Sequence, residues 1–227
     1  MEHISRLLSQ ARSEIQNLAS PTTPPSTSDP WEPNLDAYEP SLVVAAAEAK
    51  RFVAEMRAHP QVTRAHPGRW LTLSGLYGCG KTHLAKQIFT EAERINPASY
   101  KNAPFWEADP DGKAQRRPKA RWHSERSFSS IVRGGDWGYP YYLGSDFFVC
   151  LDDLGSERDN SAFIATNLFD LANARCGKWT LFTTNLTLAE IDARVDGRLA
   201  SRLIRDDNVF IRIKARDYAL QPKPALL

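Results

Sequence analysis

The stretch "GLYGCGKT", residues 75–82, decides the fold of this chain. It fits the pattern G-x-x-x-x-G-K-[ST] and lies between a strand-like segment, "WLTLSG", and a helix-like segment, "KTHLAKQIFTEAERI". Glycines let a backbone curl without Cβ clashes, so that its N–H groups point inward, and the following helix adds a positive terminus. A chance match is the alternative, but the flanking strand and helix reduce its odds. The pattern therefore predicts a loop that binds phosphates.

This loop predicts ATP and Mg²⁺ as ligands. Lys81 is expected to reach the β- and γ-phosphates, and the Thr82 hydroxyl is expected to bind Mg²⁺. The residues expected to contact ATP are Gly75, Tyr77, Gly78, Cys79, Gly80, Lys81, Thr82 and His83.

A second stretch, "SDFFVCLDDLGSE", residues 145–157, runs five apolar residues into two adjacent acids, Asp152 and Asp153. Such an apolar run predicts a strand buried on both faces, and two carboxylates at its end are costly without a positive partner. Mg²⁺ would supply that charge, bound by Asp152 together with Thr82. Asp153 would then orient or deprotonate the attacking water. The alternative is a structural acid pair that caps a turn before Gly155.

The rest of the chain alternates strand-like and helix-like segments, which predicts right-handed crossovers and a parallel sheet covered on both faces. The fold class is therefore α/β, a three-layer P-loop NTPase with a five-stranded, mostly parallel sheet. The expected strands are "WLTLSG", "ARWHSE", "FFVCLD", "WTLFTTN" and "VFIRIK"; the later expected helices are "SAFIATNLFDLANARC", "LAEIDARV" and "GRLASRLI". The polar segment 96–119 is expected to be a long surface loop.

The N-terminal region predicts two further units. Residues 1–19 have apolar positions at three- and four-residue steps, typical of an amphipathic helix that either docks a partner or folds back on its own domain. Residues 20–40 are rich in proline and read as a flexible linker. The ATPase domain would occupy 41–227, beginning with a helix capped by Ser41.

Composition narrows the class of protein. A net charge of +2 over 227 residues is too small to indicate nucleic-acid binding by itself. The three cysteines are widely spaced and odd in number, so neither a disulfide framework nor a zinc module is indicated. No apolar run approaches the roughly 18 residues of a membrane helix, and charges interrupt the N-terminus, so no membrane partner and a cytoplasmic location are expected.

Four motifs in order, "GLYGCGKTHLA", "FVCLDDLGSE", "TLFTTNL" and "GRLASRL", resemble the AAA+ ATPases of the DnaC-type helicase-loader and IstB-type transposition-helper group. The resemblance covers roughly Ser41 to the C-terminus. It implies a five-stranded parallel sheet with an extra strand between the two nucleotide motifs, where "ARWHSE" is well placed. It also implies Mg²⁺-dependent ATP hydrolysis in a homo-oligomer.

The resemblance assigns two more residues. Asn185 in "TTN" is similar to the sensor-1 residue, which feels the γ-phosphate or the attacking water; the alternative, compatible with it, is an N-cap for "LTLAEI". Arg202 in "GRLASRL" is similar to the arginine finger, which reaches the nucleotide of a neighbouring subunit. The alternative for Arg202 is a solvated basic face above Leu199 and Leu203.

Two departures from the group also matter. Asp153 stands where most AAA+ proteins have glutamate; it shortens the reach by one methylene and implies slow turnover. The chain stops soon after "VFIRIKARDYAL", so no C-terminal lid domain, with its sensor-2 arginine, is expected.

Contacts to single-stranded DNA are expected in the segment before the second acidic motif. There the group inserts a DNA-contacting helix, and Arg126 and Arg133 are the candidate contacts. Trp122 would either stack a base or pack in the core, and the tyrosines at 139, 141 and 142 are expected to pack.

The sequence thus predicts an ATP-dependent loader that assembles on single-stranded DNA and delivers a replicative helicase. The nearest alternative is a transposition helper whose partner is a transposase. Two rivals come from other classes: a small-molecule P-loop kinase, and an ATP-switched DNA-binding module without hydrolysis.

Overall fold

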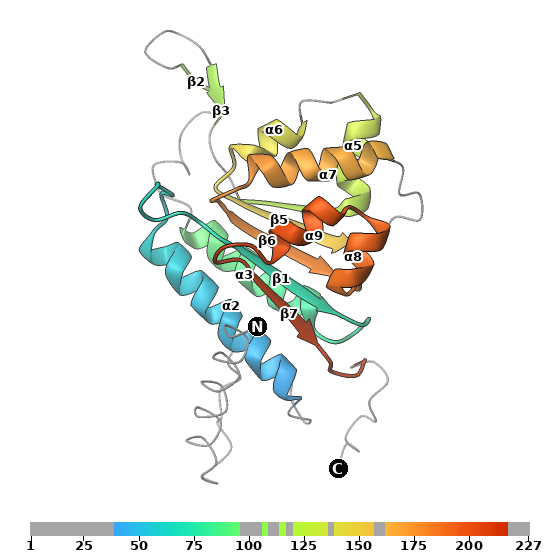
Figure 1. Ribbon diagram of the computed structural model, residues 1–227. Coiled ribbons are helices and arrows are strands. Elements are labelled where there is room, and N and C mark those ends of the chain that lie inside the picture. Colours follow the sequence, from blue (N-terminus) through green and yellow to red (C-terminus); the bar gives the residue numbers. More distant parts are fainter. Residues whose placement is uncertain are drawn as a thin grey trace, which may run out of the picture.

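The computed structural model describes residues 39–95, 106–108, 114–116, 120–135, 139–156 and 162–217. The predicted helix at 1–19 and nearly all of the predicted linker lie outside the described residues. Two parts of the structure position the candidate site, namely one central sheet and the helices on its two faces (Figure 1).

The central sheet has five strands in the order β4-β5-β6-β1-β7, and all neighbouring pairs are parallel. The strands are β1 (Trp70–Gly75), β4 (Ala120–Ser124), β5 (Phe148–Leu154), β6 (Trp179–Thr184) and β7 (Val209–Ile213). All five are where the sequence predicts them: four are mostly apolar runs bounded by turn residues, whereas β4 mixes polar residues with Ala120 and Trp122 and is half-buried. The extra strand expected from "ARWHSE" is β4, at one edge of the sheet.

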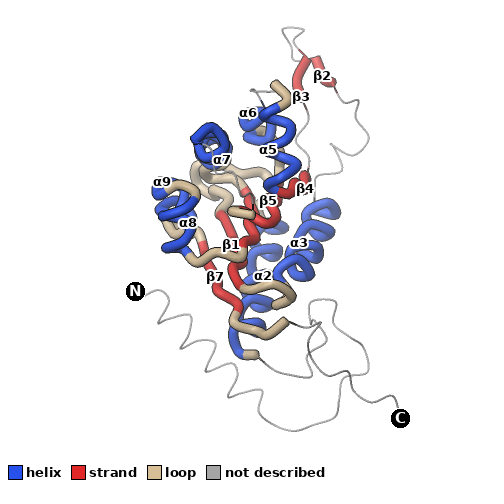
Figure 2. The backbone as a smooth tube through the Cα atoms, turned by 90° about the vertical axis from the view of Figure 1, so that its right-hand side faces the viewer, coloured by secondary structure: helices blue, strands red, loops and turns tan. Residues whose placement is uncertain are grey.

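Helices cover both faces of the sheet (Figure 2). Each face has its own hydrophobic core. One face carries α2 (Pro40–Ala58) and α3 (Lys81–Ile95). The other carries α5 (Glu125–Arg133), α6 (Tyr139–Gly144), α7 (Ala162–Ala174), α8 (Leu188–Arg194) and α9 (Gly197–Leu203). The three-layer α/β/α architecture is therefore confirmed.

The start of α2 differs from the prediction. The helix begins at Pro40, whose fixed φ suits a first helical position, and Glu39 is the N-cap residue without a side-chain cap bond. The proposed cap by Ser41 is wrong, because Ser41 lies inside the first turn. Its hydroxyl instead accepts the backbone N–H of Lys214 at 2.8 Å, which ties α2 to the end of β7.

The segment predicted as one long surface loop contains a short antiparallel pair, β2 (Trp106–Ala108) with β3 (Ala114–Arg116). Next to it, Trp122 on β4 is half-buried and packs edge-on against Phe89 at a centroid distance of 5.6 Å. Trp122 therefore packs in the core, as one of the two predicted alternatives has it.

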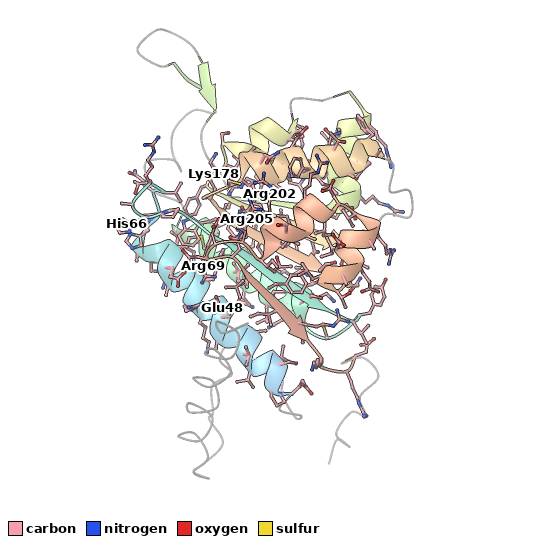
Figure 3. All side chains as sticks on the ribbon, viewed as in Figure 1. Glu48, His66, Arg69, Lys178, Arg202 and Arg205 are labelled. Atoms are coloured by element: carbon pink, nitrogen blue, oxygen red, sulfur yellow. The ribbon has the colours of Figure 1, made fainter. Side chains whose placement is uncertain are left out.

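Two buried arginines fix the helices against the sheet. Arg69, directly before β1, pairs with Glu48 of α2 at 2.9 Å (Figure 3). Its guanidinium carbon lies 5.1 Å from the Phe52 ring centroid. Arg175, after α7, is completely buried, and burial lowers the pKa of its guanidinium to about 9. It donates to four backbone carbonyls, those of Leu143, Asp146, Phe147 and Trp179. A buried carbonyl without a donor costs about 1–3 kcal/mol, so these bonds from Arg175 stabilise the amino-terminal end of the sheet at β5 and β6.

Candidate active site

The predicted phosphate loop connects β1 to α3 and is closely packed on itself. Gly78 and Gly80 have φ values of 69° and 98°, a left-handed conformation that glycine adopts without strain. At Gly75, an added Cβ would lie 2.6 Å from both the Cys79 sulfur and the Ile213 carbonyl oxygen. A larger residue at any of these three positions would deform the loop, so the glycines of the motif have a clear structural reason.

Lys81, the first residue of α3, places its ammonium group inside this loop. Its side chain is 5% exposed, and Nζ donates to the carbonyl oxygens of Gly75 at 3.0 Å and Leu76 at 2.7 Å. These neutral acceptors hold the cation without cancelling its charge. Thr82 follows, half-buried in the first turn of α3, whereas His83 is exposed, as is Tyr77 in the loop.

The parallel sheet brings the two acids to the same edge as this loop. β6 lies between β5 and β1, and Thr184 on β6 is in register with both Leu154 and Ser74. The carboxyl ends of β1, β5 and β6 therefore meet, and β5 and β1 lie two strand spacings, or about 10 Å, apart. Ligands of open α/β sheets bind at this edge.

The two acids lie on a β-bulge. Between Leu151 and Leu154, β5 has one residue more than β6, so Asp152 and Asp153 together oppose Thr183. Asp153 adopts φ 60°, and aspartate is one of the few residues other than glycine that tolerate this conformation. The bulge gives the adjacent acids different backbone conformations and ends the regular pairing of β5 at the edge of the site.

Thr183 holds both acids through a single hydroxyl. It donates to Oδ1 of Asp152 and accepts the backbone N–H of Asp153 at 2.9 Å. Sequence reasoning missed Thr183, because "TTN" was interpreted only through its asparagine. The signal was present, since a buried strand with two adjacent threonines places a hydroxyl on each face.

Burial disfavours the ionised form of Asp152. Its side chain is largely buried, and burial is the main cause that raises the pKa of its carboxyl; the neighbouring Asp153 raises it too. The bond from Thr183 and the positive charges of Lys81 and Lys86 lower it.

Asn185 follows β6 and does not cap the next helix. The N-cap of α8 is Thr187, which forms a reciprocal capping box with Glu190: Glu190 N–H to Thr187 Oγ1 at 3.2 Å and Thr187 N–H to Glu190 Oε2 at 2.7 Å. The capping alternative for Asn185 is therefore wrong. Its amide oxygen Oδ1 is buried and has no hydrogen-bond partner among the described residues. Such an oxygen is costly unless a ligand or water completes it.

These residues fit a magnesium–nucleoside triphosphate complex. The glycine loop offers inward N–H groups, Lys81 offers a buried positive charge, and Asn185 offers an uncompensated amide oxygen. Asp152 and Thr82 supply only a carboxylate and a hydroxyl, which suits Mg²⁺, an ion that takes its other ligands from phosphate and water. In the described part of the chain no group of three or more His, Cys, Asp or Glu forms a metal cage by itself.

Arg202 lies at the opposite end of the sheet. On α9, its carbonyl oxygen accepts from Asn208 at 2.7 Å, and Asn208 in turn accepts the N–H of Trp70, the first residue of β1, at 2.7 Å. The loop begins at Gly75, five residues farther along the strand, which corresponds to about 17 Å. Arg202 therefore cannot reach the phosphate loop of its own chain; Figure 3 shows it toward the end of the sheet where Arg69 lies.

Arg194, Arg198 and Arg202 follow one another at four-residue intervals, but they do not lie on one continuous helix. Arg194 ends α8, and Asp196 starts a new helix by accepting the N–H groups of Arg198 and Leu199. Arg198 and Arg202 thus share a face of α9 without Arg194.

The predicted DNA contacts lie on α5. Arg126 and Arg133 are both exposed on this helix. Tyr139 packs against His123, and its hydroxyl lies 3.0 Å from His123 Nε2, in keeping with the predicted packing role. Nothing about the side chains of the other two tyrosines, at 141 and 142, is described. No helix in the described ranges is long and apolar enough to cross a bilayer.

No family model matches this chain, and no curated protein matches it. The DnaC helicase loader matches with a TM-score of 0.55 and 22% identity over 83% of this chain and 100% of that one. DnaI matches with a TM-score of 0.58 and 17% identity over 84% and 89% of the two chains. AMPPCP-bound DnaA from Aquifex aeolicus matches with a TM-score of 0.53 and 16% identity over 78% of this chain and 48% of that one.

At these identities the matches establish the fold. The strand order, the glycine loop after β1 and these three structures agree: the chain has the AAA+ type P-loop fold.

Proposed function

We propose that this chain is an ATP-dependent accessory ATPase of DNA replication, acting as a helicase loader on single-stranded DNA. The proposal is supported by the edge of the sheet where Lys81, Asp152 and Asn185 converge. It is further supported by the fold, which is shared with a helicase loader and with a DnaA solved with AMPPCP. A replication initiator DnaA of similar fold, with 18% identity and a TM-score of 0.50, was solved with AMPPCP and single-stranded DNA.

The residues of this chain divide the proposed hydrolysis between them. The water oxygen forms a bond to the γ-phosphorus as the bond from that phosphorus to the bridging oxygen breaks, and ADP leaves with the electron pair. Asp153 accepts the water proton, and Asn185 orients the water or the γ-phosphate. Lys81 stabilises the negative charge. Mg²⁺, held by Asp152 and Thr82, would neutralise phosphate charge.

The observation that carries the proposal is that Arg202 is linked through Asn208 to Trp70, at the start of β1, whereas the phosphate loop begins at the other end of that strand. The five residue steps from Trp70 to Gly75 span about 17 Å, so this guanidinium is too far from its own loop to stabilise the transition state there. It can do so only for a neighbour whose loop faces it, so hydrolysis becomes a property of a homo-oligomer. A small-molecule kinase would not require such an arrangement.

The test compares three variants in one ATPase assay with and without single-stranded DNA. Lys81→Ala should lose ATP binding. Arg202→Ala should bind ATP normally. Its DNA-stimulated hydrolysis rate should fall by up to about 10³–10⁵-fold, which is the contribution of an arginine finger to kcat. Arg205→Ala is the matched control, because Arg205 is exposed at the same end of the sheet and its guanidinium hydrogen-bonds only the Ser201 hydroxyl, at 3.3 Å, among the described residues. Normal ATP binding by Lys81→Ala would refute the site, and unchanged turnover by Arg202→Ala would refute the finger.

The client of the loader needs its own experiment. Capture with the Lys81→Ala protein and with wild type, in the presence of ATP, should recover a hexameric helicase with the wild type. Recovery of a transposase instead would favour the transposition-helper alternative. Phosphate transfer to a metabolite without DNA stimulation would favour the kinase. ATP-dependent DNA binding without any hydrolysis would favour the switched binding module.

A further inference from the structure

Two arginines of α9 share one aromatic ring of α7. The guanidinium carbon of Arg198 lies 4.1 Å from the ring centroid of Phe169, and that of Arg202 lies 5.0 Å from the same centroid. Phe169 is half-buried, so one part of its ring packs in the layer of helices and the rest supports the two cations. Both distances are within the range of cation–π attraction.

The two arginines are held in different ways. Arg198 forms an ion pair with Asp196 at 2.8 Å, and that acid is also the N-cap of α9, so the charge of Arg198 is compensated locally. Arg202 makes no ion pair with any described residue. Its side-chain contacts are the Phe169 ring and the Cys176 sulfur, to which Nη1 donates at 2.9 Å.

This difference has a chemical consequence. A carboxylate beside Arg202 would occupy its N–H donors and cancel the charge that a phosphate has to feel. A ring and a thiol restrict the side chain while leaving most of its donors and its full charge available. Arg198, held by Asp196, contacts one part of the Phe169 ring. Arg202 contacts the same ring on the side toward Cys176.

We propose that Phe169 is a positioning residue for Arg202, holding its guanidinium ready at the subunit face without neutralising it. The inference rests on the proposed function, because it assigns Arg202 the task of meeting a neighbour's triphosphate. A long side chain that is already ordered loses less rotamer freedom when it binds phosphate. Phe169 therefore acts on the contact between Arg202 and the triphosphate of the neighbouring subunit. It makes no contact with the nucleotide of its own subunit.

The test substitutes the ring and measures turnover and assembly separately. Phe169→Leu should lower the DNA-stimulated kcat by about 3- to 30-fold, as expected for loss of a cation–π contact, and leave the KM for ATP unchanged. Phe169→Tyr should restore kcat because it keeps the ring. AMPPCP-induced assembly, followed by sedimentation velocity, should need a higher protein concentration in Phe169→Leu. Phe163→Leu, on the same helix, is the control for loss of a phenyl ring.

A mixing experiment separates positioning from a folding defect. Lys81→Ala subunits lack a working loop but keep an intact Phe169 and Arg202, so they should restore activity when mixed with Phe169→Leu subunits. Subunits whose own site had been damaged would gain nothing from this mixture. Equal melting temperatures of the variants would confirm that the chain still folds.

The outcomes distinguish the inference from the proposed function. Loss of activity in Arg202→Ala with normal kcat in Phe169→Leu would overturn the inference and leave the finger standing. A defect in Phe169→Tyr equal to that of Phe169→Leu, or no rescue by mixing, would also overturn it. Unchanged activity in Arg202→Ala would overturn the proposed function itself.

Discussion

Thr183 on β6 donates its hydroxyl hydrogen to Oδ1 of Asp152 on β5, across the bulge that interrupts their pairing. The Thr183 hydroxyl oxygen also accepts the backbone N–H of Asp153, so one uncharged side chain fixes the backbone and the orientation of two acids. A hydroxyl suits this task because it can donate and accept at once.

Replacing Thr183 with valine keeps the shape of the side chain and removes both bonds. We expect the free energy of unfolding to fall by about 1–3 kcal/mol, because the half-buried N–H of Asp153 loses its acceptor. The pKa of Asp152 should rise further, since a bond that lowers it is gone. The Mg²⁺ concentration needed for tight ATP binding should increase. Thr183→Ser should behave like wild type, and equal Mg²⁺ dependence in valine and serine variants would contradict this role.

Asp152→Asn should stabilise the protein while it disables the proposed Mg²⁺ site. Burial raises the pKa of Asp152, so the native state holds this proton more tightly than the unfolded chain. In the pH range between the two pKa values the native state binds more protons, and the free energy of unfolding falls as pH rises.

Without Mg²⁺ and nucleotide, the variant should therefore melt at a higher temperature than wild type at pH 7. This gain should vanish below the ordinary carboxyl pKa of about 3.9. Adding Mg²⁺ and ATP should reverse the order, because only wild type gains from binding. A variant that is less stable at pH 7 would show that burial is not the dominant cause.

Asp153→Asn tests the proposed base at constant backbone geometry. Asparagine tolerates the left-handed φ as well as aspartate does, so stability and ATP affinity should stay within about 0.5 kcal/mol of wild type. Hydrolysis should fall by about 10²–10⁴-fold, the usual contribution of a positioned base. Single-turnover measurements with saturating ATP give the rate. Asp153→Ala should in addition lose stability, because alanine is strained at positive φ.

Asn185→Ala and Thr187→Ala should have opposite effects. The amide oxygen of Asn185 makes no hydrogen bond within the described residues, so Asn185→Ala should change the free energy of unfolding little. The variant should still bind ATP but lose hydrolysis. Thr187 caps α8, and its loss should cost about 0.5–2 kcal/mol while the rate per folded molecule is kept. Thermal unfolding and turnover measured on both variants check this pairing. A large loss of stability in Asn185→Ala would indicate a structural role.

Local patterns in the sequence were sufficient for the sheet and the glycine loop. The bounds of β1 and α3 follow directly from "WLTLSG" and "KTHLAKQIFTEAERI", because strand and helix periodicity change at the glycines. The carboxyl edge of the sheet follows from parallel pairing, which is why Asp152 and Lys81 could be placed together in advance.

The features that sequence reasoning missed depend on contacts between distant segments. The bulge at Asp152 appears only once β5 is paired with β6, and the role of Thr183 follows from that register. The two capping errors have another cause. At α8 the box Thr187-x-x-Glu190 was readable and outranks Asn185 as a helix start, while at α2 the start at Pro40 displaces Ser41 into the first turn.

The separation of Arg202 from Gly75 along β1 would also give the proposed assembly a direction. If Arg202 meets the loop of a neighbour, each protomer has an acceptor half at one end of its sheet and a donor half at the other, and copies would join head to tail. A closed ring would then complete every site, whereas an open spiral would contain one fewer complete site than it has protomers. In a spiral, the terminal protomer whose loop meets no Arg202 would hydrolyse its ATP most slowly. Unhydrolysed ATP would therefore mark that end of the spiral.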